Sequence, residues 1–224
     1  MSVSRLLNLC CATAMVCSLS ISVSAQSSSS SKHTKESSTT STAAVDSGAV
    51  SNGVYRNKAL GLACKIPAGW VLRTEEMNSE DQVKDEEKPS TQGSQRSTGE
   101  QRVLLAAFSR PPEARGEDIN SSILIAAESV DAYPGLKEAA QYFGPLTEVA
   151  KAQGFTVDEE PYEYAVGAKK LVRGDFRKDV GTRVMRQSTL AFLSHGYAVS
   201  ITIIGGTEDE VEELIDGISF GSKQ

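Results

Sequence analysis

Histidine and cysteine are the residues of this 224-residue chain best suited to catalysis or metal binding, and both are scarce. The two histidines are His33, which lies in a Ser/Thr-rich stretch, and His195. His195 is therefore the one folded candidate for the general base of a Ser–His–Asp hydrolase. Its neighbours Ser194 and Gly196 predict a hairpin turn, and the sequence contains no G-x-S-x-G nucleophile motif. We favour a chain without a catalytic site and keep a small hydrolase using His195 as the alternative.

Cys64 lies in the apolar run Leu62–Ile66, apart from the other cysteines. A free cysteine in such a run behaves as a small core hydrophobe, so we predict that Cys64 is buried. The alternatives are a reactive thiol, an intermolecular disulfide or a pair with His195. The other three cysteines are Cys10, Cys11 and Cys17. All three precede the export cleavage site predicted below, so the processed chain contains one cysteine and no intramolecular disulfide.

A metal centre requires several convergent nitrogen, sulfur or oxygen ligands. The acidic stretch Asp158–Glu163 lacks the regular ligand spacing of a calcium loop. The sequence therefore predicts no metal and no cofactor. Gly205-Gly206-Thr207 precedes a predicted helix, whose N-terminus could bind an anion. A strand-to-helix turn with a helix cap is the favoured interpretation of these three residues.

The N-terminus has the pattern of a cleavable export signal. Arg5 is followed by the apolar, uncharged stretch Leu6–Val23, and the small residues around Ala25 fit a cleavage site between Ala25 and Gln26. The stretch is short and serine-rich for a membrane span. Residues 1–25 are therefore predicted to be a signal peptide, which places the processed protein in the periplasm or outside the cell without a transmembrane segment.

Lipid anchoring is disfavoured, because Cys10 follows Leu9 and Cys17 follows Val16, whereas a lipoprotein needs a small residue before the acylated cysteine. Residues 26–50 are rich in Ser and Thr and poor in aliphatic side chains. Such a segment buries too little apolar surface to fold, and we predict a disordered tether.

The chain is acidic, with 23 Lys and Arg against 29 Asp and Glu and a formal net charge of −6. A nucleic-acid-binding protein needs a basic footprint, and none is evident. The same argument disfavours binding to anionic lipid. The expected partners are another envelope protein or a small ligand.

Residues 51–224 are predicted to form one α+β domain, with a disordered insertion at about 78–100 that could instead be a recognition segment. Apolar runs such as Val103–Phe108 and Ile123–Ala127 indicate central strands. Residues Pro134–Gln153 have helical spacing interrupted by Gly144-Pro145, which predicts one kinked helix or two short ones. The polar Phe155–Tyr164 suits an edge strand.

The last helix is predicted from a capping box formed by Thr207 and Glu210. Its apolar face repeats at helical spacing over Val211, Leu214, Ile215 and Ile218. Its acidic residues Glu212, Glu213 and Asp216 are expected to face solvent, where they could alternatively form a docking surface.

The order of several short motifs resembles the PsbP-like family, which includes extrinsic photosystem II subunits, a Ran-binding import factor and bacterial exported proteins. The motifs are Tyr55-Arg56-Asn57, Ile66-Pro67-Ala68-Gly69-Trp70, Gly196–Ile201 and Glu213–Phe220. The resemblance covers roughly Gly53–Phe220 and implies an antiparallel sheet sandwiched between helices. It implies no shared catalytic residue. The sequence thus favours an exported, non-enzymatic binding or assembly module, with a small-molecule or lipid carrier as a further alternative.

Overall fold

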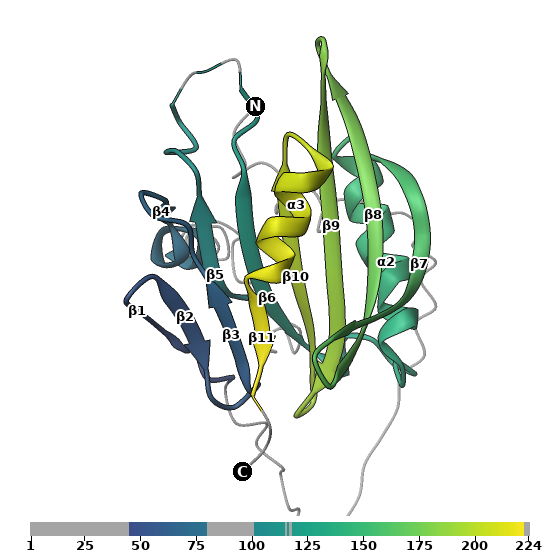
Figure 1. The fold of residues 1–224 in the computed structure, drawn as a ribbon. Coiled ribbons are helices and arrows are strands. Elements are labelled where there is room, and N and C mark those ends of the chain that lie inside the picture. The colour runs from purple at the N-terminus through teal and green to yellow at the C-terminus, as the bar shows by residue number, and fades with distance from the viewer. Residues whose placement is uncertain (1–44, 80–100, 115, 117, 222–224) are drawn as a thin grey trace, which may run out of the picture.

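The computed structural model describes residues 45–79, 101–114, 116 and 118–221. Within them the chain forms two antiparallel sheets and two principal helices (Figure 1). The predicted signal peptide, its cleavage site at Ala25 and Gln26, most of the predicted tether and residues 80–100 of the predicted insertion lie outside the described residues.

The larger sheet has seven strands, and β10 lies at its centre. Each strand pairs antiparallel with its neighbours, so Ile201 on β10 lies opposite Ile125 on one side and Leu190 on the other. In sheet order the strands are β4 (Val71–Leu72), β5 (Arg102–Phe108), β6 (Ser122–Ser129), β10 (Tyr197–Gly205), β9 (Arg183–Ser194), β8 (Lys169–Val180) and β7 (Thr156–Val166). The central strands are thus the predicted apolar runs, and the polar β7 has the edge position predicted for it.

A four-stranded sheet and helix α3 (Glu208–Asp216) cover one face of this sheet, here called the front face (Figure 1). The small sheet has the order β1 (Ala49–Ser51), β2 (Val54–Asn57), β3 (Leu62–Lys65) and β11 (Ile218–Phe220). β1 lies at the end of the predicted tether, so regular structure begins earlier than expected. Ile218, predicted as helical, belongs to β11, because α3 ends at Asp216 and Gly217 is its C-cap.

Helix α2 (Ala139–Ala152) packs on the opposite, back face over β7, β8 and β9. A short 3₁₀ helix, η3 (Val130–Ala132), precedes it, and residues 74–79 are also helical. Pro145 lies inside α2, which continues through it as one helix. Gly174 on β8 makes this packing possible, because a Cβ there would lie 2.6 Å from Cε1 of Phe143.

The α+β class is therefore observed, but the predicted arrangement of helices is not. Two antiparallel sheets dominate, and the small sheet occupies much of the front layer where a second helical layer was expected. The apolar faces of β2 and β3 pack on the larger sheet in that layer. Within the described residues no helix combines the length and hydrophobicity needed to cross a membrane.

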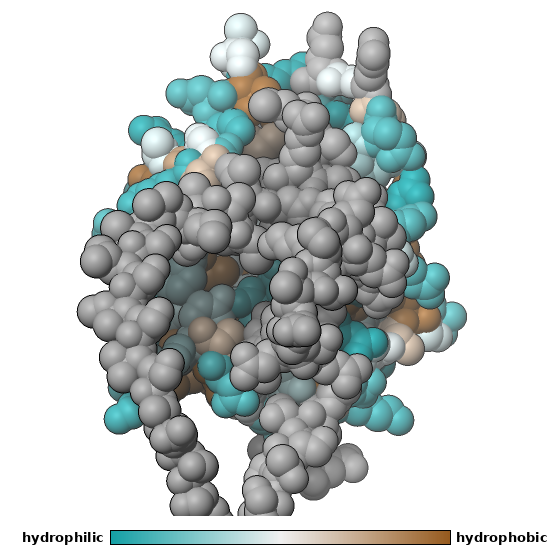
Figure 2. All heavy atoms as spheres, turned by 180° about the vertical axis from the view of Figure 1, so that it is seen from behind, coloured by the Kyte–Doolittle hydropathy of each residue, from teal (hydrophilic) through white to brown (hydrophobic). Residues whose placement is uncertain are grey.

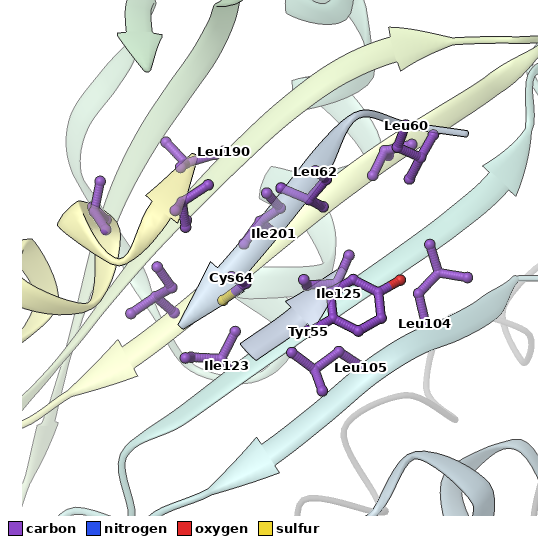
Figure 3. Packing of buried hydrophobic residues seen from close by; sticks show 14 of the residues in the cluster. Tyr55, Leu60, Leu62, Cys64, Leu104, Leu105, Ile123, Ile125, Leu190 and Ile201 are labelled. Carbon is purple, nitrogen blue, oxygen red and sulfur yellow. The ribbon is translucent and has the colours of Figure 1, made fainter. Parts of the chain in front are cut away.

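The main core lies between the small sheet and the front face of the larger sheet. Figure 3 shows Cys64 and Tyr55 pointing into it beside Ile123, Leu105 and other aliphatic side chains. Alternation along the strands sends neighbouring residues to the back face, so Leu190 joins this core while Ala191 packs with α2.

Candidate functional site

Cys64 is buried, as predicted, with no exposed surface. Desolvation raises the pKa of its thiol from 9.0 to about 12. Its Sγ lies 3.8 Å from the carbonyl oxygen of Lys65, and β3 pairs it with Ile218 on β11. A protonated thiol in a closed core is a poor nucleophile, and this position does not support a reactive thiol or an intermolecular bridge.

His195 occupies the exposed two-residue turn between β9 and β10, as predicted. It has a left-handed backbone with φ of +51°, and Gly196 follows with φ of +80°, which is the geometry of a tight hairpin turn. Its Nδ1 lies 2.9 Å from Oγ of Ser194. The turn is exposed while Cys64 is enclosed, so the structure does not bring these two residues together.

The predicted anion site at Gly205-Gly206-Thr207 is occupied by the chain's own carboxylate. Glu210 accepts a hydrogen bond from the Gly206 amide at 2.8 Å and one from the Ser121 hydroxyl at 2.5 Å. Thr207 Oγ1 accepts from the Glu210 amide at 3.1 Å, so the helix cap is confirmed. The favoured interpretation, a capped strand-to-helix turn, therefore describes this site.

A pocket of about 440 Å³ opens beside this turn, between the β5–β6 connection and the β8–β9 hairpin. Its charged side chains all have partners within the chain, because Arg183 pairs with Asp118 and Glu210 accepts the hydrogen bonds described above. These contacts join the hairpin, the connection and α3, which gives the polar groups of the pocket a structural role.

The acidic stripe predicted on the last helix needs one correction. Glu213 and Asp216 are exposed, but Glu212 is half-buried and its carboxylate lies 2.5 Å from a terminal nitrogen of Arg173. Glu212 occupies the side of α3 that faces β8, so it serves as an anchor of the helix.

Arg173 is only 7% exposed and is the centre of a polar cluster on the front face. Its Nε lies 3.0 Å from the Asp175 carboxylate, which also accepts hydrogen bonds from Tyr162 and Ser188. Burial alone lowers the pKa of Arg173, but the hydrogen bond to Glu212 and the charge of Asp175 outweigh it and raise that pKa. Burial, followed by the charge of Asp175, raises the pKa of Tyr162 to about 12. The cluster is fully paired, so it locks α3 onto the sheet.

The acidic residues of β7 do not converge on a metal site. Asp158 forms ion pairs with Arg177 and Arg186, and in the described part of the chain no three His, Cys, Asp or Glu side chains gather as metal ligands.

A different group of charged residues gathers where α2 begins. A shallow depression of about 230 Å³ lies between the start of α2 and the ends of β7, β8 and β9, and we call it the lysine depression. It is lined by Lys137, Ala139, Glu163, Lys169, Lys170, Leu171, Val172, Phe192 and Leu193.

Lys137 and Lys170 are exposed, and neither forms an ion pair with any residue that the structure describes. The ammonium group of Lys169 lies 4.7 Å from the centre of the Phe192 ring. Glu163 is the only acid in the lining. The lining therefore holds more lysines than acids beside an apolar floor, in a chain that is acidic overall.

The floor is part of the folded core. Leu171 and Phe192 are buried, and Val172 and Leu193 pack with the aromatic residues of α2. The first turn of α2 closes one side, and its Gln141 side chain accepts hydrogen bonds from the amides of Lys137 and Glu138. The backbone of Lys137 is thereby held against the first turn of α2.

Sequence analysis missed this site, because it forms only when the segment before α2 meets the start of β8. The adjacent Lys169-Lys170 pair beside a predicted turn was the one signal available. Lys137 gave none, since an isolated lysine before a helix is ordinary.

Comparisons with known proteins leave the family open. No protein-family model and no curated protein matches the sequence. LpqN of Mycobacterium tuberculosis, described as involved in cell envelope biogenesis, aligns with a TM-score of 0.35 and 11% identity, over 72% of this chain and 83% of LpqN. A protein of Bacteroides thetaiotaomicron aligns with a TM-score of 0.35 and 10% identity, over 72% of this chain and 46% of that protein. The likeness is too low to transfer a function, and membership of the PsbP-like family stays a prediction.

Proposed function

We propose that this chain is an exported, non-enzymatic binding module of the cell envelope, with the fold of the PsbP-like family, that captures a small anionic ligand at the lysine depression. The export signal predicted over residues 1–25 supports the location. The depression supports the activity, because it is concave and partly apolar, and because its Lys137 and Lys170 form no ion pair within the described chain.

The proposal rests on one observation about Lys137 and Lys170, namely that their charges are not paired within the described chain. Other charged groups of the fold are engaged, such as Arg173 with Asp175 and Arg183 with Asp118. Lys137 and Lys170 line one concave site and have no ion pair within the described chain. Cationic groups held close together repel one another, and an anion between them relieves this repulsion. Ligand binding gives these lysines a role that folding does not.

Lysine footprinting tests the proposal. The full chain is incubated with a detergent extract of its host's envelope or with buffer, acetylated briefly and analysed by peptide mass spectrometry. We expect protection of Lys137 and Lys170, while the exposed Lys58 and Lys65 on the small sheet react equally in both samples. Equal reaction of all four lysines in both samples would overturn the proposal. Sequencing the N-terminus of the exported protein tests its location, and a start at Gln26 is expected.

A hydrolase is the second candidate, because Ser194 Oγ lies within hydrogen-bond distance of His195 Nδ1. The variant His195→Asn tests it without breaking the turn, since Asn-Gly favours the same backbone. If the hydrolase hypothesis is correct, an ester or peptide hydrolysis by the purified protein disappears in this variant. Under the binding proposal, no such activity depends on His195, and ligand protection of Lys137 and Lys170 is unchanged.

A further inference from the structure

We propose that two copies of this chain associate face to face through their front layers, with helix α3 of each copy lying on the small sheet of the other. The inference goes beyond the proposed function, because it concerns a surface separate from the lysine depression. The charges of the helix and of the sheet, their position in one layer and their size support it.

The outer face of the small sheet is basic. Alternation along its strands turns Tyr55 and Cys64 into the core, so their neighbours Arg56 and Lys65 point away from it. Both cations are exposed, and neither forms an ion pair with any residue that the structure describes. The strands of the small sheet contain no Asp or Glu. This face therefore carries positive charge that the sheet itself does not balance.

The rest of this outer face consists of small side chains. The row that contains Arg56 continues across the sheet through Ala49, Ala63 and Ser219. The row that contains Lys65 continues through Val54 and Ser51. Because the neighbouring side chains are short, the two cations stand above a flat surface that another element can approach closely.

The outer face of α3 is acidic. Asp209, Glu213 and Asp216 recur at i, i+4 and i+7, which places them on one side of the helix. All three are exposed, and none forms an ion pair with a residue of the described chain. The helix dipole disfavours negative charge in the last turn, and that turn contains no basic residue. The acids near the end of α3 therefore gain from cations that another molecule supplies.

The basic sheet and the acidic helix adjoin one another in the front layer (Figure 1). The Lys65 amide donates a hydrogen bond of 2.9 Å to the carbonyl oxygen of Gly217, the C-cap of α3. A Cβ on Gly217 would lie only 3.3 Å from Cβ of Lys65. A two-fold axis between these neighbouring surfaces turns the acidic helix of each copy onto the basic sheet of the other. One face of the molecule is thus complementary to itself.

The size of the two surfaces predicts a weak and reversible dimer. The nine-residue helix and the four-stranded sheet together present an area on the order of 400 Å². A stable interface buries about 800 Å² on each partner. The net charge of −6 also repels a second copy at long range, although salt screens this repulsion beyond about 8 Å. The short-range ion pairs between α3 and the small sheet must therefore supply most of the attraction.

Sedimentation equilibrium of the full chain tests the inference over a range of protein and salt concentrations. One variant reverses the sheet charges, Arg56→Glu/Lys65→Glu, and a second reverses the helix charges, Glu213→Lys/Asp216→Lys. A third variant combines all four substitutions and so exchanges the two charges. The control Lys137→Glu/Lys170→Glu makes the same change in charge as the first variant, at exposed lysines outside the front layer. Circular dichroism and urea titration establish that each variant is folded.

We expect the wild type to form dimers as its concentration rises, with a dissociation constant that increases about tenfold or more in molar salt, where the screening length falls to about 3 Å. Reversing either surface alone should weaken the dimer at least about tenfold, because attraction becomes repulsion at close range. The combined variant should recover the affinity of the wild type to within about threefold, and the control should change it by less than about threefold.

The helix variant separates a specific contact from an effect of net charge. It makes the chain less acidic, so general repulsion between copies decreases, and an association governed by net charge would become tighter. Tighter or unchanged association of this variant would overturn the inference. So would loss in both single-surface variants without recovery in the combined one, because the two surfaces would then not contact each other.

The wild type alone also tests the inference without any substitution. A chain that stays monomeric at every concentration and in low salt would overturn it. Growth beyond a dimer would overturn the two-fold arrangement, because a closed symmetric contact leaves no further copy of these surfaces free. Equal losses in the sheet variant and in the control would show that the small sheet has no specific part in the association.

Discussion

The two faces of the seven-stranded sheet each carry a group of charged side chains, and the groups differ in how their charge is satisfied. On the front face, the buried Arg173 is paired with Asp175 and Glu212 between β8 and α3. Near the start of α2 on the other face, Lys137 and Lys170 are exposed and have no ion pair within the described chain. A buried charge must be paired for the fold to be stable, whereas an exposed charge need not be. The first group therefore serves the fold and the second is available to a ligand.

The largest expected effect comes from breaking the front-face cluster. The variant Arg173→Leu leaves Asp175 and Glu212 without their cation, and we expect a loss of about 3 kcal/mol in the free energy of unfolding, measured with urea. The matched control Arg183→Leu breaks the exposed pair with Asp118 and should cost less than about 1 kcal/mol. Equal losses in the two variants would contradict the distinction between buried and exposed charge.

The packing of α2, which forms one wall of the lysine depression, gives the next largest effect. In Gly174→Ala the new methyl group would lie 2.6 Å from Phe143, so the helix must shift. We expect a loss of about 2 kcal/mol, typical of an overpacked core. Gly144→Ala is the control, because it adds a methyl in the same helix with no atom within 4 Å. Its effect on the free energy of unfolding should stay below about 1 kcal/mol, because the gain in helix propensity is offset by the clash of a Cβ with the ring of Pro145, which follows it. A loss in the free energy of unfolding well below about 2 kcal/mol for Gly174→Ala would contradict close packing of α2 on β8.

The front core predicts a dependence on alkaline pH. The pKa of Cys64 is about 12 in the folded chain and near 9.0 when the thiol is free, so the folded state holds this proton more tightly. This contribution to stability is complete below pH 9 and is lost as the pH rises from 9 towards 12. Between pH 9 and pH 10 the wild type should lose about 1 kcal/mol more than Cys64→Ala in urea titrations.

Cys64→Ala is itself expected to be less stable, because it truncates a buried side chain, so the comparison uses the slope with pH and not the absolute stability. A parallel decline in both proteins would mean that water reaches the thiol, and the front face would then be less closed than the back.

Much of the larger sheet was predictable, because unbroken apolar runs such as Val103–Phe108 have few alternatives to a central strand. The edge position of β7 followed from its acidity and Pro161. The small sheet was not predictable as a separate unit. Its strand β11 comes from the end of the chain, and Ile218 has the same spacing as the apolar face of α3. Only the break at Gly217 distinguishes the strand from the helix.

The candidate sites likewise divide into those that the sequence predicted and those that it did not. Local signals correctly predicted the burial of Cys64 and the turn at His195. The prediction that Glu212 faces solvent was wrong, because the spacing of residues along a helix does not reveal that Arg173 on β8 lies beside it. The lysine depression escaped notice for a similar reason, since its lysines come from segments separated by α2 and β7. A site formed within one helix, strand or turn can be predicted from the sequence. A site formed between such elements can be predicted only when the topology that brings them together is known.

The smallest change in stability is expected at the lysine depression, where it tests directly whether the exposed lysines serve the fold. Lys137→Gln/Lys170→Gln removes two exposed charges that make no ion pair in the described chain, so the free energy of unfolding should change by less than about 0.5 kcal/mol. The measurement is a urea titration alongside Lys58→Gln/Lys65→Gln, a control with the same change in charge. A loss above about 1.5 kcal/mol confined to the first pair would show that these lysines hold the start of α2 on the sheet. A loss of ligand binding in this variant would then report a damaged fold, and the contrast between charge that serves folding and charge that serves binding would fail at the lysine depression.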